Sequence, residues 1–251
     1  MKPFTFAFLT DPQIGMNSPN GLEGEGSDKS RLDIAVDYIN EKEFEFLIFG
    51  GDQVNRGFSE SEIDVFMAST ERIKIPWYGV SGNHDQEERY MSIEETPKRF
   101  SFFQNDCFFM GFNATELRGD AEKLTEGLQA KEWAYLRESF TPEADDAKFR
   151  FVFMHWPLFI NHPEEDGSYW NMPNRLELLE FFKEKKVSCV FSGHYHQDID
   201  IDWQGIRLIS STSTSGPLHY PEQPAFKIIT VFEDGYSVRR ISAEKPEFDP
   251  R

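Results

Sequence analysis

The sequence predicts an α/β fold built as one domain, and three observations support this prediction. The chain has 251 residues, which suits one large domain with a sizeable core. Short apolar runs rich in aromatic and β-branched residues alternate with segments of helical periodicity. These runs fit strands that are buried on both faces of a sheet. No linker or internal repeat divides the chain, so we expect a single domain over residues 1–251.

Apolar runs that end in turn residues predict the strands. They are FTFAFL (4–9), FEFLIF (44–49), WYGVS (77–81), CFFMGFN (107–113), RFVFMH (150–155) and SCVFSG (188–193). After these runs the pattern changes, because DIDIDWQGIRLISST, AFKIITVF and YSVRRIS follow one another without helical segments between them. We expect these last segments to form a terminal antiparallel or mixed section.

Two of the helical segments have recognisable starts. Ser30 with Asp33 resembles a capping box, and the apolar residues that follow fall on one helical face. Asn174 with Glu177 predicts the start of another helix. That helix ends in KEKK (183–186), where positive charge suits a helix C-terminus.

Composition and charge exclude several classes of protein. The formal net charge of -18 argues against nucleic acid and anionic membrane surfaces as partners, but not against phosphorylated substrates, because metal ions reverse a local field. No run of 18 apolar residues exists, so no membrane span is expected, and the N-terminus fits a first strand better than a signal peptide. We therefore expect a cytoplasmic protein, and a monomer.

Three further expectations concern single segments. Cys107 and Cys189 sit in apolar runs, so we expect two buried free thiols. The segment 15–30 reads as a flexible polar loop, and residues 244–251 as a frayed end.

Residues that can bind metal ions follow several of the predicted strands. They are Asp11; Asp52, Asn55 and Arg56 in GGDQVNRG; Asn83, His84 and Asp85 in SGNHD; His155 in MHWP; and His194 and His196 in SGHYH. Ligands bind outside the carboxyl ends of the strands in an open α/β sheet, so these residues would converge on one place. Mixed carboxylate, amide and imidazole ligands suit Mn²⁺, Zn²⁺ or Fe better than Ca²⁺. The lack of cysteine among them argues against a structural zinc site.

Each motif alone has an ordinary structural explanation. An aspartate after a strand is commonly a helix cap or a turn residue, and Gly-Asn is first a turn signal. A lone histidine after a strand is more often structural than a ligand. The combination is what indicates a site, since five strand ends carry such residues and four of the six histidines of the chain are among them.

The series DPQ, GDQVN, GNHD, H and GHYH resembles the calcineurin-like metallophosphoesterase family, in order and spacing, from residue 11 to residue 196. The resemblance is strongest to the calcineurin-like phosphoesterase-domain serine/threonine phosphatases, which also read Asp-Pro-Gln at the first motif. FSGHYH, and HWPLF followed by an acidic loop with a tyrosine, are similar to that subgroup as well. The resemblance implies an α/β fold of four layers, an αββα sandwich of two mixed sheets flanked by helices.

The same resemblance implies a dinuclear metal-dependent phosphohydrolase. Asp52 would bridge both metals, Asp11 and His196 would complete the first site, and Asn83, His155 and His194 would complete the second. Two metals about 3.5–4 Å apart clamp a phosphate and lower the pKa of a bridging water, so that the hydroxide attacks phosphorus in line. His84 would reach the phosphate without being a ligand, and would stabilise the transition state or protonate the leaving oxygen. The alternative for His84 is a turn histidine.

Gln13 departs from the family pattern, which usually has histidine there. An amide oxygen is a weaker and harder ligand than imidazole nitrogen. We therefore expect the first metal to bind less tightly and to favour Mn²⁺ or Mg²⁺ over iron. The alternative is that Gln13 points away and water fills the position.

Asn55 stands where many protein phosphatases have an aspartate that orients the catalytic histidine. Asn55 cannot supply that charge, so His84 is oriented either by hydrogen bonding alone or by Asp85. Arg56 follows it, and its guanidinium is a candidate to hold phosphate in a bidentate way. A solvated surface arginine is the alternative for Arg56.

The segment 157–175 is expected to form the rim of the site. Because rim loops commonly set the choice of substrate, His162 and Tyr169 in this segment are candidate substrate-binding residues, together with Asn55. The acidic run in the segment either repels acidic peptides or is simply solvated. Residues 219–226 are a candidate for the opposite side of the rim, although His219 belongs to no motif.

Three functions remain open at this point. The first is hydrolysis of phosphomonoesters, with phosphoserine or phosphothreonine as candidate substrates and Mn²⁺ as the favoured metal. The second is a phosphodiesterase or pyrophosphatase that acts on nucleotides or lipid-linked diphosphates. The third is a non-catalytic metal-binding scaffold, which Gln13 and Asn55 favour and the retention of His84 opposes.

Overall fold

The computed structural model describes residues 1–118, 127–216, 218 and 223–246, and contains two mixed β-sheets. The first sheet has the order β11-β10-β1-β2-β3. Its strands are β1 (Phe4–Leu9), β2 (Phe46–Phe49), β3 (Trp77–Gly79), β10 (Ala225–Val231) and β11 (Tyr236–Ser242). The second has the order β4-β5-β6-β7-β9-β8. Its strands are β4 (Phe100–Gln104), β5 (Cys107–Gly111), β6 (Phe149–Phe153), β7 (Cys189–Ser192), β8 (Ile199–Trp203) and β9 (Ile206–Ser210).

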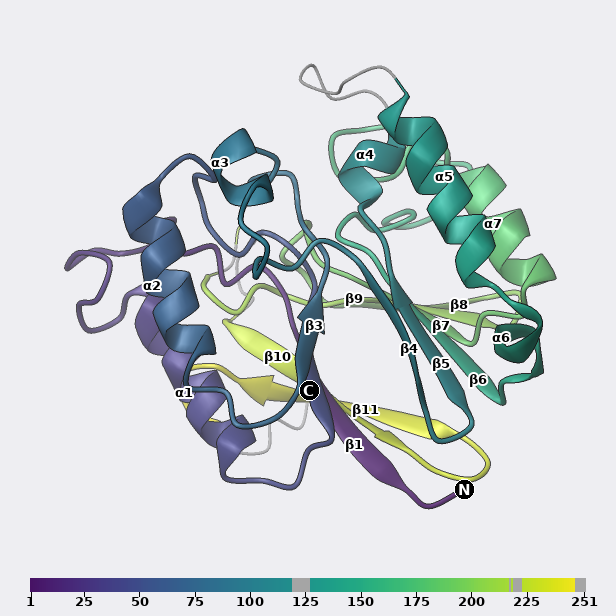
Figure 1. The fold of residues 1–251 in the computed structure, drawn as a ribbon, viewed down its shortest axis with the longest axis horizontal. Coiled ribbons are helices and arrows are strands. Elements are labelled where there is room, and N and C mark those ends of the chain that lie inside the picture. Colours follow the sequence, from purple (N-terminus) through teal and green to yellow (C-terminus); the bar gives the residue numbers. More distant parts are fainter. Residues whose placement is uncertain (119–126, 217, 219–222, 247–251) are drawn as a thin grey trace.

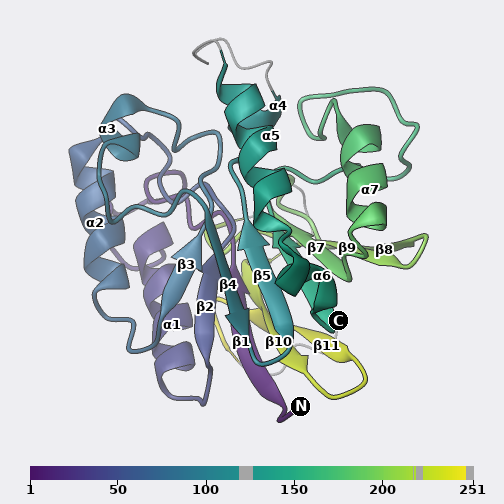
Figure 2. The same ribbon diagram turned by 45° about the vertical axis from the view of Figure 1, so that its right-hand side comes forward.

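Helices cover the outer face of each sheet, so the four layers of the predicted sandwich are present (Figure 1). The helices beside the first sheet are α1 (Asp28–Asn40) and α2 (Glu60–Thr70), with the short α3 (Glu88–Met91) at one end. Those beside the second are α4 (Ala114–Arg118), α5 (Leu128–Ser139), α6 (Pro142–Asp146) and α7 (Arg175–Glu184) (Figure 2). No helix within the described ranges is both long enough and apolar enough to cross a membrane.

Phenylalanine fills the space between the two sheets. Phe6 and Phe8 of β1 meet Phe109, Phe153 and Phe191 of the second sheet, with ring centroids 5.3 Å apart for Phe6 and Phe109. Burying apolar surface contributes about 25 cal/mol per Å², so this aromatic layer is a main source of stability. The layer packs the two sheets against each other, so the carboxyl ends of strands from both sheets lie close together.

Each of the six apolar runs contains an observed strand, with ends that differ by up to two residues. The strand β4 was not predicted from the sequence, and its residues alternate between half-buried and exposed positions. The terminal strands are antiparallel neighbours as expected, but they divide between the sheets: β8 and β9 join the second, and β10 and β11 the first. Their partners decide this, because β9 pairs with β7 and β10 pairs with β1.

The helix starts confirm one local prediction and correct another. The N-cap of α1 is Ser27, whose hydroxyl accepts a hydrogen bond from the backbone N–H of Ser30, so the predicted cap lies three residues too late. The helix α7 begins where expected, with Asn174 as its N-cap residue. The Asn174 side chain makes no capping hydrogen bond, because its amide donates to the Leu117 carbonyl.

The segment 15–30 is only partly a loop. Its last residues, from Asp28 onward, belong to α1, and the buried Asp28 carboxylate accepts hydrogen bonds from the backbone N–H groups of Gly15 and Asn17. Both cysteines are free and buried, as predicted. Most of the predicted frayed end, and His219 with its neighbours up to residue 222, lie outside the described residues.

Candidate metal centre

The predicted metal ligands meet at the carboxyl ends of the strands. Asp11 follows β1, Asp52 follows β2, Asn83 follows β3, His155 follows β6, and His194 and His196 follow β7. Contacts join residues from the two sheets: His196 Nε2 lies 3.1 Å from Asp11 Oδ1, and His155 Nε2 lies 3.1 Å from Asp52 Oδ2. The structure therefore brings together side chains that lie up to 185 positions apart in the chain.

The ligand atoms form two adjoining groups. Asp52, His155 and His194 each offer an atom within 4.8 Å of the other two, and all three residues are buried. Asp11 and His196 form the neighbouring pair, and His155 Nε2 lies 3.9 Å from Asp11 Oδ1. This division agrees with two adjacent cation sites that share the Asp52 region.

Each histidine at the centre binds a backbone carbonyl through one ring nitrogen. The pairs are His155 Nδ1 with Gly50 O (2.9 Å), His196 Nδ1 with Gly216 O (3.1 Å), His194 Nε2 with Tyr169 O (3.0 Å) and His84 Nδ1 with Asn55 O (2.7 Å). A carbonyl oxygen only accepts hydrogen bonds, so the paired nitrogen carries a proton. In the neutral ring the opposite nitrogen then keeps its lone pair, which is the form that binds a metal ion.

Two buried acceptor atoms at the centre, Gln13 Oε1 and Asn83 Oδ1, have no hydrogen-bond partner. His155 Nε2 has the Asp52 carboxylate 3.1 Å away as its partner. Buried polar atoms are normally paired, and leaving one unpaired costs about 1–3 kcal/mol. Bound cations would satisfy both atoms, and would replace the proton that His155 shares with Asp52, so the donor set fits divalent metal ions. The Gln13 oxygen is available as a ligand, and its part in metal binding stays a prediction.

The backbone of the centre is strained. The φ angles are 50° at Asp11, 40° at Gln13, 51° at Asp52, 61° at His194 and 53° at His196. Residues other than glycine pay about 1–2 kcal/mol for this left-handed conformation, and such outliers concentrate at functional sites. The strain persists because hydrogen bonds and packing from both sheets hold these turns in place.

Two glycines of the motifs make room for the carboxylates. A Cβ on Gly82 would overlap the Asp52 carboxylate, and one on Gly193 would overlap the side chains of Thr10 and Asp11. The Gly-Asn and Gly-His pairs thus have a role beyond turn formation, which is close approach of backbone to ligand.

Mutual charges set the protonation of the buried groups. Burial raises the pKa of Asp52, but the charge of His155 outweighs it and holds that pKa well below its usual range. Burial lowers the pKa of His155, but Asp52 and Asp11 raise it to about 9. Burial and the charge of His155 together lower the pKa of His194 to about 3. Asp52 and His194 are therefore in their metal-binding forms at neutral pH, and His155 releases a proton when a cation binds.

A buried hydroxyl-rich segment, residues 210–216, supports the first group of ligands. Ser213 Oγ donates to the Asp11 carbonyl at 2.8 Å and accepts from the backbone N–H of Gly216 at 3.1 Å. Gly216 in turn orients His196. The prediction from sequence missed this segment, although the run SSTSTSG between two strands is unusually polar for fully buried residues.

His84 lies beside the ligands and is oriented by hydrogen bonding. Its backbone N–H donates to Asp52 Oδ1 at 2.9 Å, and its Nδ1 binds the Asn55 carbonyl. Asp85, named above as a catalytic candidate, is instead fully buried and accepts from the backbone N–H groups of Gln53 and Gly82. Burial, then the charge of Asp52, raises the pKa of Asp85 to about 7. The position of Asp85 suits holding the loops of Asp52 and Asn83, not contact with substrate.

Arg56 is an exposed arginine, which agrees with the surface alternative, and its part in holding phosphate stays a prediction. Its guanidinium binds the fully buried Glu62, with Nε 2.6 Å from Glu62 Oε1. The same carboxylate accepts from the Arg56 backbone N–H at 2.7 Å. The ion pair directs Arg56 towards Glu62 and anchors the loop that carries Asn55.

The rim segment has two candidate substrate-binding residues, and one of them, Tyr169, contacts an expected metal ligand. Tyr169 Oη accepts a hydrogen bond from Asn83 Nδ2 at 3.3 Å. His162 is exposed and accepts from the Glu164 backbone, with no contact to the ligands among the described interactions. Asn55, the third candidate, has its side-chain oxygen 3.5 Å from Gln13 Nε2. The acidic run is not wholly solvated, because Glu165 accepts backbone hydrogen bonds within the rim.

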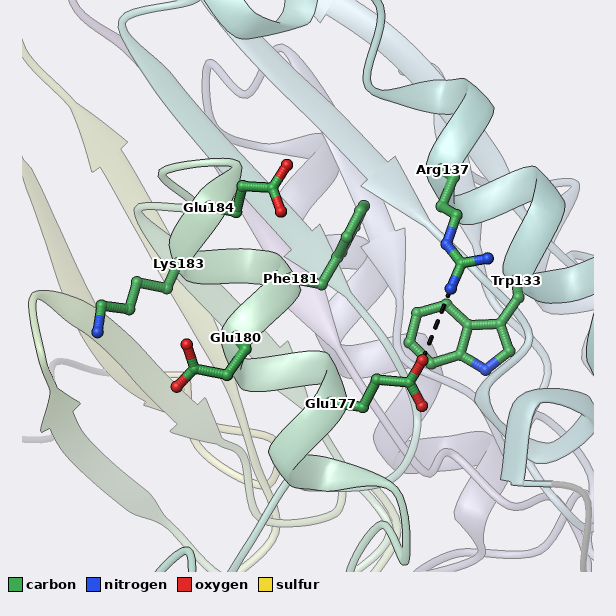
Figure 3. Close-up of a pocket in the computed structure, with 7 residues that line it drawn as sticks. All are labelled: Trp133, Arg137, Glu177, Glu180, Phe181, Lys183 and Glu184. Atoms are coloured by element: carbon green, nitrogen blue, oxygen red, sulfur yellow. Dashed lines mark ion pairs between the residues drawn. The ribbon is translucent and has the colours of Figure 1, made fainter.

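A groove of about 640 Å³ lies elsewhere, between α5 and α7 (Figure 3). It is lined by Trp133, Arg137, Glu177, Glu180, Phe181, Lys183 and Glu184. Arg137 pairs with Glu177 across it at 3.6 Å. None of its lining residues belongs to the ligand set.

An αββα sandwich with carboxylate, amide and imidazole ligands at its strand ends defines a dinuclear metallohydrolase. Comparison with known proteins narrows this class. The description "Calcineurin-like phosphoesterase" belongs to the family whose sequence model matches residues 4–198. The chain belongs to this family, and it is a metal-dependent phosphohydrolase.

Individual relatives agree with this assignment. Serine/threonine-protein phosphatase CPPED1 of Rattus norvegicus is 28% identical over 236 residues, which cover 84% of this chain and 75% of that protein. The 3',5'-cyclic adenosine monophosphate phosphodiesterase CpdA of Escherichia coli K12 is 24% identical over 184 residues, covering 70% and 62%. A solved dimetal phosphatase from Danio rerio shares the fold with a TM-score of 0.71 at 16% identity, covering 98% of this chain and 99% of that one.

Proposed function

We propose that the chain hydrolyses phosphomonoesters with two divalent metal ions, Mn²⁺ being the favoured metal. The observation that carries the proposal is the set of unpaired buried ligand atoms beside an oriented His84. The resemblance to serine/threonine phosphatases supports phosphoserine and phosphothreonine as candidate substrates. The net charge of -18 speaks against nucleic acid as a substrate.

The predicted ligands divide between the two ions. Asp52, Asp11 and His196 would hold one ion with Gln13, and Asn83, His155 and His194 would hold the other with Asp52. When bound, such ions polarise the phosphoryl oxygens and lower the pKa of water.

His84 has its Nδ1 fixed on the Asn55 carbonyl, so Nε2 is free to hold a proton for the leaving oxygen. Tyr169 would contact the substrate from the rim. Burial, followed by the charge of Asp52, raises the pKa of Tyr169, so its hydroxyl stays a hydrogen-bond donor.

Hydrolysis of the diester is the second candidate, because the relative CpdA is a cyclic-nucleotide phosphodiesterase. The test is turnover of p-nitrophenyl phosphate beside its bis(p-nitrophenyl) diester, after metal removal and addition of Mn²⁺, Mg²⁺ or Zn²⁺. Metal-restored preference for the monoester supports the proposal. Preference for the diester supports the second candidate, and no turnover with any metal supports a scaffold.

The variant His84→Ala separates catalyst from scaffold. A catalyst should lose roughly 10²–10⁴-fold in kcat, since general acid catalysis contributes that much, while keeping its metal content. Elemental analysis of the purified variant is the control. Unchanged turnover in a metal-loaded His84→Ala protein would contradict the role given to His84.

A further inference from the structure

Aromatic side chains gather against His194 on the outer side of the metal centre. The ring centroids of Trp156, Tyr169 and Trp170 lie 3.6, 5.0 and 5.5 Å from that of His194. Trp156 is buried, whereas Tyr169 is 56% exposed. Metal binding requires none of these rings, so their position at the centre needs another explanation.

Trp156, Tyr169 and Trp170 form an aromatic wall, and contacts with neighbouring residues fix its position. Trp156 donates through Nε1 to Thr115 Oγ1 at 3.0 Å, and the Arg118 guanidinium lies 3.9 Å from its ring. Tyr169 packs edge-on against Trp156 at 5.4 Å and against Trp170 at 5.1 Å. The wall is therefore built in advance of any ligand, which lowers the entropy cost of binding.

The rim backbone that carries the wall is also fixed. The Glu165 carboxylate accepts from the backbone N–H groups of Ile160 and Asn161 and from Asn171 Nδ2. The buried Arg175 donates to the carbonyls of Pro163 and Met172. These two charged groups bind the loop itself and stabilise it, so the loop holds Tyr169 and Trp170 in a fixed position beside His194.

Tyr169 connects the wall to the reacting position. Its hydroxyl binds Asn83 and its carbonyl binds His194, and both partners are expected ligands of the second metal. A group attached to a phosphate at that metal would therefore lie within contact distance of the Tyr169 ring. An uncharged planar group gains most there, because aromatic pairs contribute about 0.5–1.5 kcal/mol beyond burial of their area.

We propose that Tyr169 and Trp170, on the base of Trp156, form a leaving-group subsite that selects phosphoesters whose leaving group carries a planar aromatic ring. The inference rests on the proposed function and narrows its substrate class, placing aromatic phosphoesters ahead of aliphatic ones such as phosphoserine. In the reaction a water oxygen bonds to phosphorus, the bond from phosphorus to the leaving oxygen breaks, and that oxygen takes up a proton.

The test compares benzyl phosphate with cyclohexylmethyl phosphate. Both have an alkyl leaving oxygen and similar size, so the planar ring is the main difference between them. The wild-type enzyme with Mn²⁺ should prefer benzyl phosphate by roughly 2–12-fold in kcat/KM, the range that corresponds to this contribution of an aromatic pair. Tyr169→Ala should reduce this ratio, and Tyr169→Ala with Trp170→Ala should bring it close to one.

Two controls accompany the variants. Tyr169→Phe keeps the ring and should keep the preference. Phe103→Ala removes a partly exposed aromatic ring on β4, outside the metal centre, and should change nothing. A wild-type ratio near one, or a ratio that survives in the double variant, overturns the subsite.

Binding separates this inference from the proposed function. Calorimetric titration of the metal-loaded protein with benzylphosphonate and cyclohexylmethylphosphonate needs no turnover. Tighter binding of the benzyl compound, lost in Tyr169→Ala, supports the subsite even if neither phosphate is hydrolysed, which would count against the proposed function alone. Equal binding of the two compounds overturns the subsite even in an active phosphatase.

Discussion

The same strands carry two opposite environments, the phenylalanine layer between the sheets and the metal centre at their carboxyl ends. In the layer, apolar rings such as Phe6 and Phe109 meet at ordinary packing distances. At the centre, turns in the left-handed conformation hold buried polar atoms, and Gln13 Oε1 and Asn83 Oδ1 have no partner. The comparison teaches that the layer stabilises the fold, and that this stability offsets a site which is unfavourable until cations bind.

The largest expected effect is on catalysis, from Asp52→Asn. Asp52 contacts His155 and the His84 backbone, and it is the carboxylate expected to be shared by both ions. Turnover of p-nitrophenyl phosphate should fall roughly 10³-fold or more. The rise in melting temperature on adding Mn²⁺ should also largely disappear, as measured by thermal unfolding with and without metal. Retention of both properties would show that Asp52 does not hold the ions.

The opposite effect is expected in the aromatic layer, from Phe109→Ala. Phe109 is fully buried and stacks on Phe102 and Phe151. The free energy of unfolding should fall by about 3–5 kcal/mol, because the substitution leaves a cavity. Chemical denaturation measures this loss. The folded fraction should keep its turnover and its response to Mn²⁺. A loss of turnover larger than the loss of folded protein would contradict the separation between a stabilising layer and a catalytic centre.

A smaller effect should come from the support of the centre, in Ser213→Ala. The change removes the hydrogen bond to the Asp11 carbonyl and the acceptor for Gly216. Affinity for one of the two ions should fall roughly 10–100-fold, as is typical for groups that orient ligands. Metal titration followed by activity tests this, with the exposed Ser237→Ala on β11 as the matched control. Equal affinities in the two variants would show that the hydroxyl-rich segment does not support the metal site.

The last effect appears only as the pH changes, and it concerns Glu132, a buried carboxyl in the helical layer that has hydrogen-bond partners. It accepts from the Asn113 backbone and pairs with Arg99. Burial raises its pKa to about 7. The folded state thus keeps the proton that the unfolded state loses near pH 4.5, so this contribution to stability is present at low pH and is lost as pH rises towards 7.

Glu132→Gln removes this titration. Relative to wild type, the variant should gain about 3 kcal/mol in free energy of unfolding between pH 4.5 and pH 7. Urea denaturation at several pH values measures the difference. A constant difference across this range would contradict the raised pKa.

Local patterns in the sequence determined much of this protein. The apolar runs located six strands, and the motifs from Asp11 to His196 named the residues that meet at the centre. Such features are readable because a strand and the residue at its end are neighbours in the chain. The resemblance of these motifs to one family supplied the sheet-on-sheet arrangement that periodicity alone does not contain.

Only the tertiary structure decided features whose partners are distant in the chain. Strands β8 to β11 divide between two sheets because of pairing with β7 and β1. Asp85 and Arg56 turn to backbone N–H groups and to Glu62, and Asn174 turns to Leu117. The carbonyls that fix each histidine, the support from Ser213 and the aromatic wall at His194 arise in the same way. A side chain binds whatever folding places beside it, and the sequence names the side chain but not its neighbour.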